Sequence, residues 1–128
     1  MKMTQYDDLE ETVYTLTLNN GLKVTLIPKK EMFKTFGIFA TQFGSIDRTF
    51  KPLGGDRLIT VPDGIAHFLE HKLFEKEDHD VFSTFSQLGA SVNAYTSSTK
   101  TAYLFSCTDH VEENLTTLID FVQDPYFS

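Results

Sequence analysis

The segment HFLEH, residues 67–71, restricts how this chain can fold more than any other feature of the sequence. Its two histidines are four residues apart, and Glu70 directly precedes the second. On an α-helix this spacing puts both imidazoles on one face, with the carboxylate beside them. We therefore expect a helix here, around which the other elements are arranged.

The flanking residues predict where this helix begins and how it packs. Pro62 and Asp63 are typical of a helix start, with Asp63 as the N-cap. At about 100° per residue, the helix has a packing face and a chemical face. The packing face would hold Ile65, Phe68, Leu69 and Leu73, and the chemical face His67, Glu70, His71 and Phe74.

The rest of the chain predicts an α+β fold, because strands and helices follow one another without regular βαβ alternation. Residues 1–12 are polar and are expected to be a loose lead-in. Asn20 and Gly21 separate two apolar runs and predict a hairpin. Strands are predicted at about 13–18, 22–26, 36–43, 92–96 and 101–107, and helices at about 63–74, 80–88 and 110–123.

Three finer expectations follow from the same patterns. The strand at 36–43 is more continuously apolar and is expected to be more central. The helix at 110–123 is expected to be capped by Asp109 and to bury an apolar stripe. Residues 44–62 form a long irregular stretch that is expected to border the site. The apolar stripe of the helix at 110–123 consists of Val111, Leu115, Leu118, Ile119 and Val122.

Composition excludes several classes of protein. The formal net charge is −7, with no cluster of lysine and arginine, so nucleic acid is not an expected partner. No apolar run approaches the roughly 20 residues of a membrane span, and the first ten residues hold no secretory signal. We expect one soluble, partial domain over residues 1–128, located in the cytoplasm.

Two histidines and a glutamate at this spacing are typical of a catalytic zinc site. A catalytic zinc ion takes three protein ligands and keeps one position open. His67 and His71 would supply two, and Glu70 would act as general base on the water. The third ligand stays open, since no acidic residue has a distinguishing spacing, and His79 in a polar run is better explained as a solvated side chain. The acidic candidates are Asp63, Glu75, Glu77, Asp78, Asp80, Glu112, Glu113, Asp120 and Asp124.

HFLEH is an inverted HxxEH motif, and its surroundings resemble a known family. DGIAHFLEHKLFE, followed by GASVNAYTSSTKTAYLF, is similar to the catalytic domain of the pitrilysin and insulinase family of zinc peptidases. The similarity runs over about residues 16–127, including FGS at 43–45 and DPYF at 124–127. The order of the elements predicts an antiparallel or mixed sheet with helices on one face, and the resemblance implies that it is the incomplete front portion of such a domain.

The resemblance also implies roles for single residues. His67 and His71 match the zinc ligands, Glu70 matches the general base, and the segment with Asn93, Ala94 and Tyr95 matches an edge strand that binds extended peptides. The family's third ligand is a glutamate some seventy to eighty residues beyond the histidines, and no residue here matches it. The expectation is therefore a truncated, inactive piece of a metallopeptidase that works with a second peptidase-like half or homologous subunit.

Two other functions compete with the peptidase. The chain is alternatively a non-catalytic peptide-binding protein, or the partner subunit of a peptidase-like assembly, which recognises peptides through residues 92–96. A structural zinc domain is disfavoured, because such sites use four closed ligands, usually thiolates, and Cys107 is the single cysteine.

Overall fold

The structure is a computed structural model that describes all 128 residues, and the chain divides into two compact units. The first comprises Met1–Phe33 and the second Lys34–Ser128. None of the helices has both the length and the apolar character that crossing a membrane requires.

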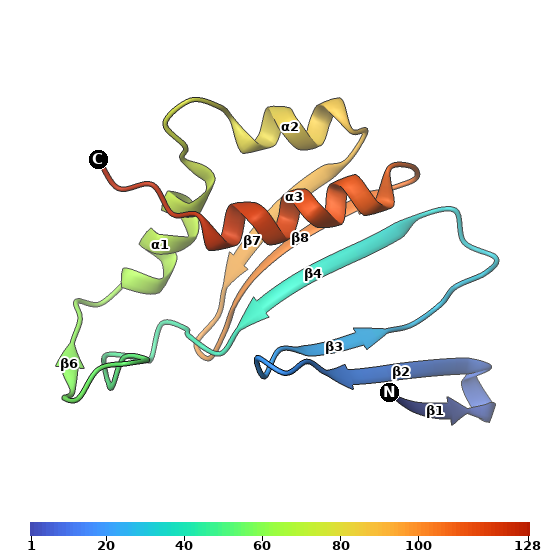
Figure 1. The fold of residues 1–128 in the computed structure, drawn as a ribbon, viewed down its shortest axis with the longest axis horizontal. Coiled ribbons are helices and arrows are strands. Elements are labelled where there is room, and N and C mark those ends of the chain that lie inside the picture. Colours follow the sequence, from blue (N-terminus) through green and yellow to red (C-terminus); the bar gives the residue numbers. More distant parts are fainter. The chain divides into compact units, whose positions relative to one another are not determined.

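The first unit is a three-stranded antiparallel sheet in the order β1-β2-β3 (Figure 1). Its strands are β1 (Lys2–Tyr6), β2 (Glu11–Thr17) and β3 (Lys23–Leu26). The predicted hairpin is confirmed as β2 and β3. Gly21 adopts φ +89° in the turn between them, and the Leu22 N–H donates to Asn20 Oδ1 at 3.0 Å. The Asn-Gly pair therefore forms the turn because it accepts backbone angles that other residues resist.

The prediction of a loose lead-in over residues 1–12 is wrong for most of that segment. β1 pairs along its whole length with β2, and a short 3-10 helix, η1 (Asp7–Leu9), connects the two strands. The sequence hid this strand because its side chains are mostly exposed. Backbone pairing alone orders β1, and a strand without a buried face has no apolar alternation.

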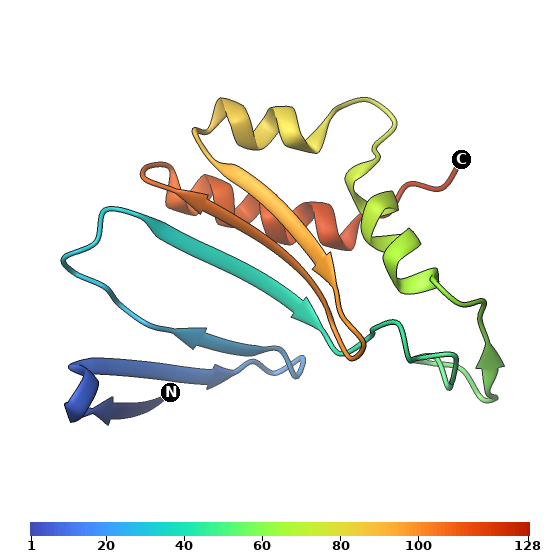
Figure 2. The ribbon, with the colours of Figure 1, turned by 180° about the vertical axis from the view of Figure 1, so that it is seen from behind.

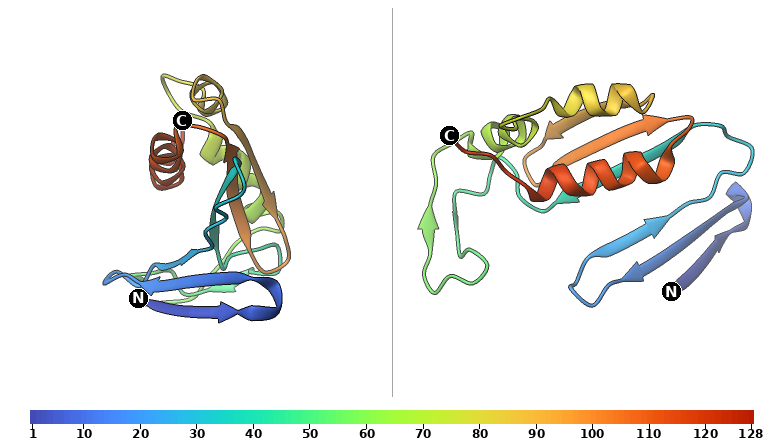
Figure 3. Two further views of the ribbon diagram at one scale, coloured as in Figure 1. Left: turned by 90° about the vertical axis from the view of Figure 1, so that its right-hand side faces the viewer. Right: turned by 45° about the horizontal axis from the view of Figure 1, so that its top comes forward.

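The second unit holds an antiparallel sheet in the order β4-β8-β7. The strands are β4 (Thr35–Thr41), β8 (Thr101–Cys107) and β7 (Ser91–Thr96). Helices α2 (Val81–Gln87) and α3 (Val111–Gln123) cover one face of this sheet (Figure 3), and Figure 2 shows the sheet from the other side. The third helix, α1 (Ile65–Phe74), packs against β7. The predicted α+β class with helices on one face is confirmed.

The expectation that the strand at 36–43 is more central is wrong within its own sheet. β8 lies in the middle of the strand order, and β4 lies at one end. Five of the seven residues of β8 are buried, whereas Phe36 and Ile38 of β4 are 61% and 49% exposed. Thr101 and Tyr103 of β8 are polar by type, yet both are buried.

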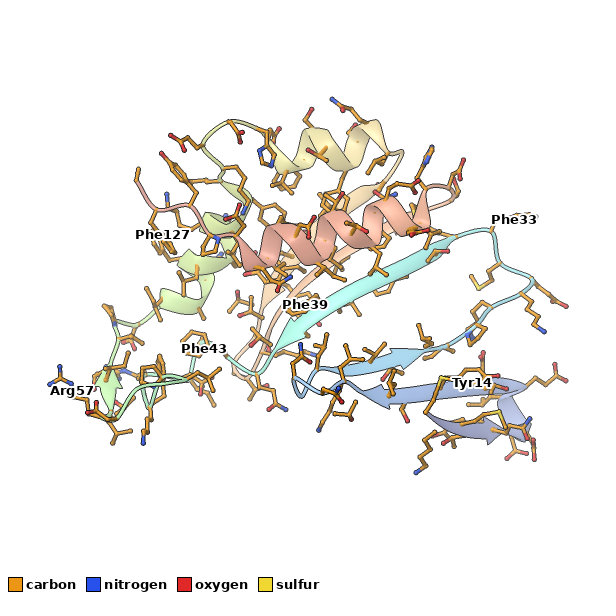
Figure 4. The ribbon with its side chains drawn as sticks, viewed as in Figure 1. Tyr14, Phe33, Phe39, Phe43, Arg57 and Phe127 are labelled. Atoms are coloured by element: carbon orange, nitrogen blue, oxygen red, sulfur yellow. The ribbon has the colours of Figure 1, made fainter.

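The core of this unit lies between the sheet and the helices. Phe39, labelled in Figure 4, projects from β4 and packs against this core, and residues of β7 pack against the core as well. Aromatic rings from α2, β8 and α3 contact one another there, including Phe85 with Phe105 at 6.1 Å between centroids. The buried members are Val81, Phe85, Tyr103, Phe105, Cys107, Leu118 and Phe121.

Helix α3 buries only part of the predicted stripe, since Leu118 is buried and Val122 packs against the core. Its buried residues are Asn114, Leu118 and Phe121, while Leu115 is 44% exposed, as are Val111 and Ile119 to similar degrees. Asn114 is fully buried because its Nδ2 donates to the carbonyls of Leu88 and Asp109, each at 3.4 Å. The Asp109 side chain accepts from the His110 N–H, so the prediction that it caps α3 is also wrong.

Residues 44–62 are less irregular than predicted. β5 (Thr49–Phe50) pairs with β6 (Ile59–Thr60), and Phe43 and Phe50 meet edge to face at 5.1 Å between centroids. The stretch is fixed at its start by Gly44, because an added Cβ would lie 2.5 Å from the backbone of Ser97 and Ser98. Only glycine permits this close approach, which anchors the loop to the turn between β7 and β8.

Candidate metal and catalytic site

The predicted helix forms, but its N-cap lies one residue later than the predicted N-cap, Asp63. Gly64, at φ +84°, occupies the N-cap position of α1, and no side chain caps the helix. Asp63 instead forms an ion pair with Arg48, whose Nε lies 2.9 Å from Asp63 Oδ1. The prediction of Asp63 as N-cap is therefore wrong.

α1 brings the two histidines together at its surface. The Nε2 atoms of His67 and His71 lie 2.9 Å apart, and their rings stack with centroids 4.8 Å apart. Both side chains are exposed. Two nitrogen ligands at about 2.0 to 2.1 Å from a tetrahedral zinc ion lie roughly 3.3 Å from each other, so the pair needs only a small adjustment to hold one. The donor set and its orientation fit this metal.

Glu70 differs from the two histidines in its burial. It is 8% exposed and, with Ala66, is the most buried residue of α1, whereas Phe68 is 55% exposed. The buried face of α1 is therefore rotated from the predicted packing face, toward Glu70. The histidines lie on the exposed side of the carboxylate, at the rim of the buried face.

The buried carboxylate has one protein donor. Thr96 Oγ1, at the end of β7, donates to Glu70 Oε2 at 2.5 Å. Tyr103, on the neighbouring strand, is 4% exposed. Burial raises the pKa of the Tyr103 hydroxyl to about 12, and the negative charge of Glu70 contributes to that rise. Burial and a nearby negative charge both disfavour the ionised form of a tyrosine hydroxyl.

A pocket next to this carboxylate joins α1 to the edge strand. It contains four of the six residues that the sequence singled out, while His67 and Tyr95 do not line it. No residue of the loop at 44–62 lines it either, so the expectation that this loop borders the site is not met there. The lining residues are Glu70, His71, Phe74, Glu75, Asp80, Phe82, Asn93 and Ala94.

The predicted peptide-binding residues lie on β7, whose outer edge has no strand partner. Asn93 is exposed, and its Oδ1 accepts from the Ala94 N–H at 2.8 Å. Tyr95 points to the opposite face of the strand from Ala94, as alternation requires, and Lys100 Nζ lies 5.7 Å from its ring centroid. The Asn93 side chain thus occupies one backbone donor at this edge.

No third metal ligand joins the histidine pair. Nowhere in the chain do three histidine, cysteine or acidic side chains gather closely enough to hold a metal ion. His79 pairs with Asp78, with 2.6 Å between Nδ1 and Oδ1, and Asp80 caps α2 by accepting from the Phe82 N–H. The acidic candidates of the sequence therefore do not complete the site.

Sequence reasoning missed Thr96 and Tyr103 as neighbours of the site. The signal was present for Thr96, which lies two residues after Ala94 and so faces the same side of β7. Nothing in the sequence indicated which side chain of α1 Thr96 would contact, because Glu70 lies 26 residues before it.

Comparison with known proteins shows the family of the chain. The family model described as Insulinase (Peptidase family M16) matches residues 61–128, more than half of the chain. The chain is 60% identical over all its 128 residues to zinc protease YmfH of Bacillus subtilis, a protein described as uncharacterized, and it spans 30% of that protein's length.

Solved structures agree as well. An M16-like peptidase from Alicyclobacillus acidocaldarius is 47% identical with a TM-score of 0.86, over 92% of this chain and 27% of the other. Pitrilysin shares the fold at a TM-score of 0.71 and 20% identity, over 95% of this chain and 13% of its own. The sequence motif, the fold and these similarities lead to one conclusion: the chain belongs to the insulinase family, peptidase family M16.

Proposed function

We propose that this chain is part of a zinc-dependent endopeptidase in which His67 and His71 bind the metal and Glu70 is the general base. The observation that carries the proposal is the pair of Nε2 atoms 2.9 Å apart beside a buried, hydrogen-bonded carboxylate. The family membership and the name of the Bacillus relative, a zinc protease, support it.

The two imidazoles fit zinc because both present a ring nitrogen to one point on the surface of α1. Zinc held there would polarise a peptide carbonyl and bring the pKa of a water ligand close to neutral. The chain's own contribution is to fix the two nitrogens on successive turns of one helix. The two rings already stack, with their centroids 4.8 Å apart.

Glu70 is suited to accept a proton. Its carboxylate lines the pocket next to His71 but lies on the buried side of the helix, so it need not be a ligand. A carboxylate partly withdrawn from water and held by one donor keeps a fixed orientation toward the attacking water. In this role Glu70 takes the proton from water and returns it to the leaving amine.

The substrate in this proposal is an extended peptide. Its backbone would add to the open edge of β7 at Asn93, Ala94 and Tyr95, forming hydrogen bonds as a further strand. The Ala94 N–H becomes available when the Asn93 side chain turns away from it. Such binding recognises the peptide backbone, and this suits an enzyme that cleaves unfolded or flexible peptides.

The complete activity requires residues beyond this arrangement. A third zinc ligand is needed, and the histidine pair has no further ligand beside it. We infer that the 128 residues alone are inactive, and that the catalytic domain to which they belong works in the cytoplasm with a second peptidase-like half or homologous subunit.

Substitution of the proposed base tests the function. In the full-length zinc-loaded protein, Glu70→Gln should retain zinc and lower kcat for an unstructured peptide by at least about 100-fold, because proton transfer is lost. Glu77→Gln, on the exposed corner before α2, is the matched control and should behave as wild type. Cleavage by Glu70→Gln at a near-normal rate would overturn the role of Glu70.

A non-catalytic peptide-binding protein is the second candidate. The observation that favours it is the open edge of β7 beside a site with only two nitrogen ligands. This function predicts saturable binding of extended peptides by the full-length protein, with no turnover at any zinc concentration. Zinc-dependent turnover would exclude it.

A further inference from the structure

The hydrogen bond from Thr96 to Glu70 links β7 to α1, two elements that pack against each other and line one pocket. Thr96 is the last residue of β7, and Glu70 lies in the middle of α1. The distance between Thr96 Oγ1 and Glu70 Oε2 is 2.5 Å. The contact is partly buried, and the carboxylate has no other protein donor. A hydrogen bond to a charged oxygen at such a distance is among the stronger kinds in proteins.

The position of the threonine is itself well determined. Thr96 pairs with Thr101 across the β7–β8 hairpin, and Thr101 is 3% exposed. The Thr101 hydroxyl donates to the Phe43 carbonyl at 2.7 Å, and the Ser45 N–H donates to the Ser97 carbonyl at 2.9 Å. A β-branched side chain on such a strand has few rotamers available. The sheet therefore fixes the backbone of Thr96, and the branched side chain leaves few orientations for its hydroxyl.

This arrangement has a direct consequence for the carboxylate. A glutamate has three side-chain torsions, and burial alone would not choose one orientation of its oxygens. The Thr96 hydroxyl fixes Oε2 and so directs the remaining oxygen, Oε1. The same strand carries Asn93 and Ala94, which line the pocket together with Glu70. One strand thus orders both the base and the backbone edge beside it.

We propose that Thr96 is a positioning residue that holds the Glu70 carboxylate in the orientation needed for proton transfer. The inference rests on the proposed function of Glu70 as general base. It assigns Thr96 no contact with substrate or metal, so its removal should affect the chemical step rather than binding.

The test compares three variants of the full-length zinc-loaded protein. Thr96→Val keeps the branched shape and removes the donor, and Thr96→Ser keeps the donor. Thr99→Val, in the exposed turn, is the matched control. Measurements are kcat and KM on one unstructured peptide, zinc content, and crystal structures of the metal-free Val and Ser variants, which report the orientation of Glu70 without reference to activity.

The expected result is a loss of kcat of roughly 10- to 100-fold in Thr96→Val, with KM within about twofold and unchanged zinc content. Thr96→Ser should recover most of the rate, and Glu70 should lose its single orientation only in the Val structure. Wild-type kcat in Thr96→Val, equal losses in both variants, or a change confined to KM would each overturn the proposal.

The two proposals fail in different ways. If the wild-type protein does not hydrolyse peptides, or Glu70→Gln is fully active, the proposed function fails. If wild type is active and Glu70→Gln is not, yet Thr96→Val matches wild type, only the positioning role fails. An ordered Glu70 side chain in the metal-free Thr96→Val structure would also contradict that role.

Discussion

Glu70 shows how a single residue departs from the periodic pattern around it. It belongs to the chemical face by sequence, yet it is 8% exposed, and its neighbours His67 and His71 are exposed. Burying a carboxylate is costly unless it receives hydrogen bonds, and the Thr96 hydroxyl supplies one. The charge of Glu70 also acts on Tyr103, whose pKa rises to about 12 mainly through its own burial.

The raised pKa of Tyr103 predicts a loss of stability in alkaline solution. The unfolded chain releases this proton near the ordinary value of about 10, whereas the folded chain retains it to about 12. The stability that Tyr103 contributes is complete below pH 10 and is lost as the pH rises to 12. Urea unfolding between pH 8 and 11.5 should show this fall in wild type and a weaker fall in Tyr103→Phe.

The control for this measurement is Tyr6→Phe, because Tyr6 is 49% exposed. That variant should follow the wild-type dependence on pH. Identical alkaline profiles for wild type and Tyr103→Phe would contradict the assignment.

Among the elements, α2 shows the clearest relation between sequence and boundary. Asp80 accepts from the Phe82 N–H at 3.0 Å as N-cap, and Gly89, at φ +70°, follows the last turn. Both residue types favour these positions, and the sequence predicted the helix at about 80–88. Val81 and Phe85 then bury their side chains in the core.

Loss of this cap should be measurable. Asp80→Ala should lower the free energy of unfolding by about 1 kcal/mol, because the Phe82 N–H loses its acceptor. Asp80→Asn keeps a side-chain oxygen and should cost clearly less. Chemical denaturation of the two variants with circular dichroism checks this, and equal stabilities for Ala and Asn would show that the cap does not matter.

The elements that the sequence predicted well are those whose signals are local. The hairpin of β2 and β3 follows from Asn20 and Gly21, and the extents of β7 and β8 follow from their bounding turns. The buried face of α3 was only partly predicted, because periodicity marks a broad apolar sector without saying which part is covered. Asn114 is buried through bonds to carbonyls of other segments, and no periodic pattern contains that information.

The same distinction holds for the site. His67, Glu70 and His71 were predicted to lie together because one helix determines their spacing. The contact between Glu70 and Thr96 joins residues 26 positions apart, and it depends on how α1 packs against β7. The residue type of Thr96 gave no indication of its partner.

At the scale of the molecule, the number of ligands limits what the 128 residues can do alone. Two imidazoles should bind zinc weakly, with a dissociation constant well above that of a three-ligand site. We expect the isolated chain to cleave an unstructured peptide no faster than a variant carrying His67→Ala and His71→Ala. Zinc titration and peptide assays check this, and chelator-sensitive cleavage by the isolated chain would refute it.

The pairing of β4 with β8 has a consequence for the order in which the second unit folds. β7 and β8 are joined by a turn of four residues, so their hairpin closes a short loop. Thr41 pairs with Thr101, 60 positions later, and α1, α2 and β7 all lie within that interval. Closing a loop of this length precedes any gain from its contacts, and such nonlocal pairings form slowly. We therefore expect the hairpin to form early and β4 to join late, so that the pocket beside Glu70 takes shape before the sheet is complete.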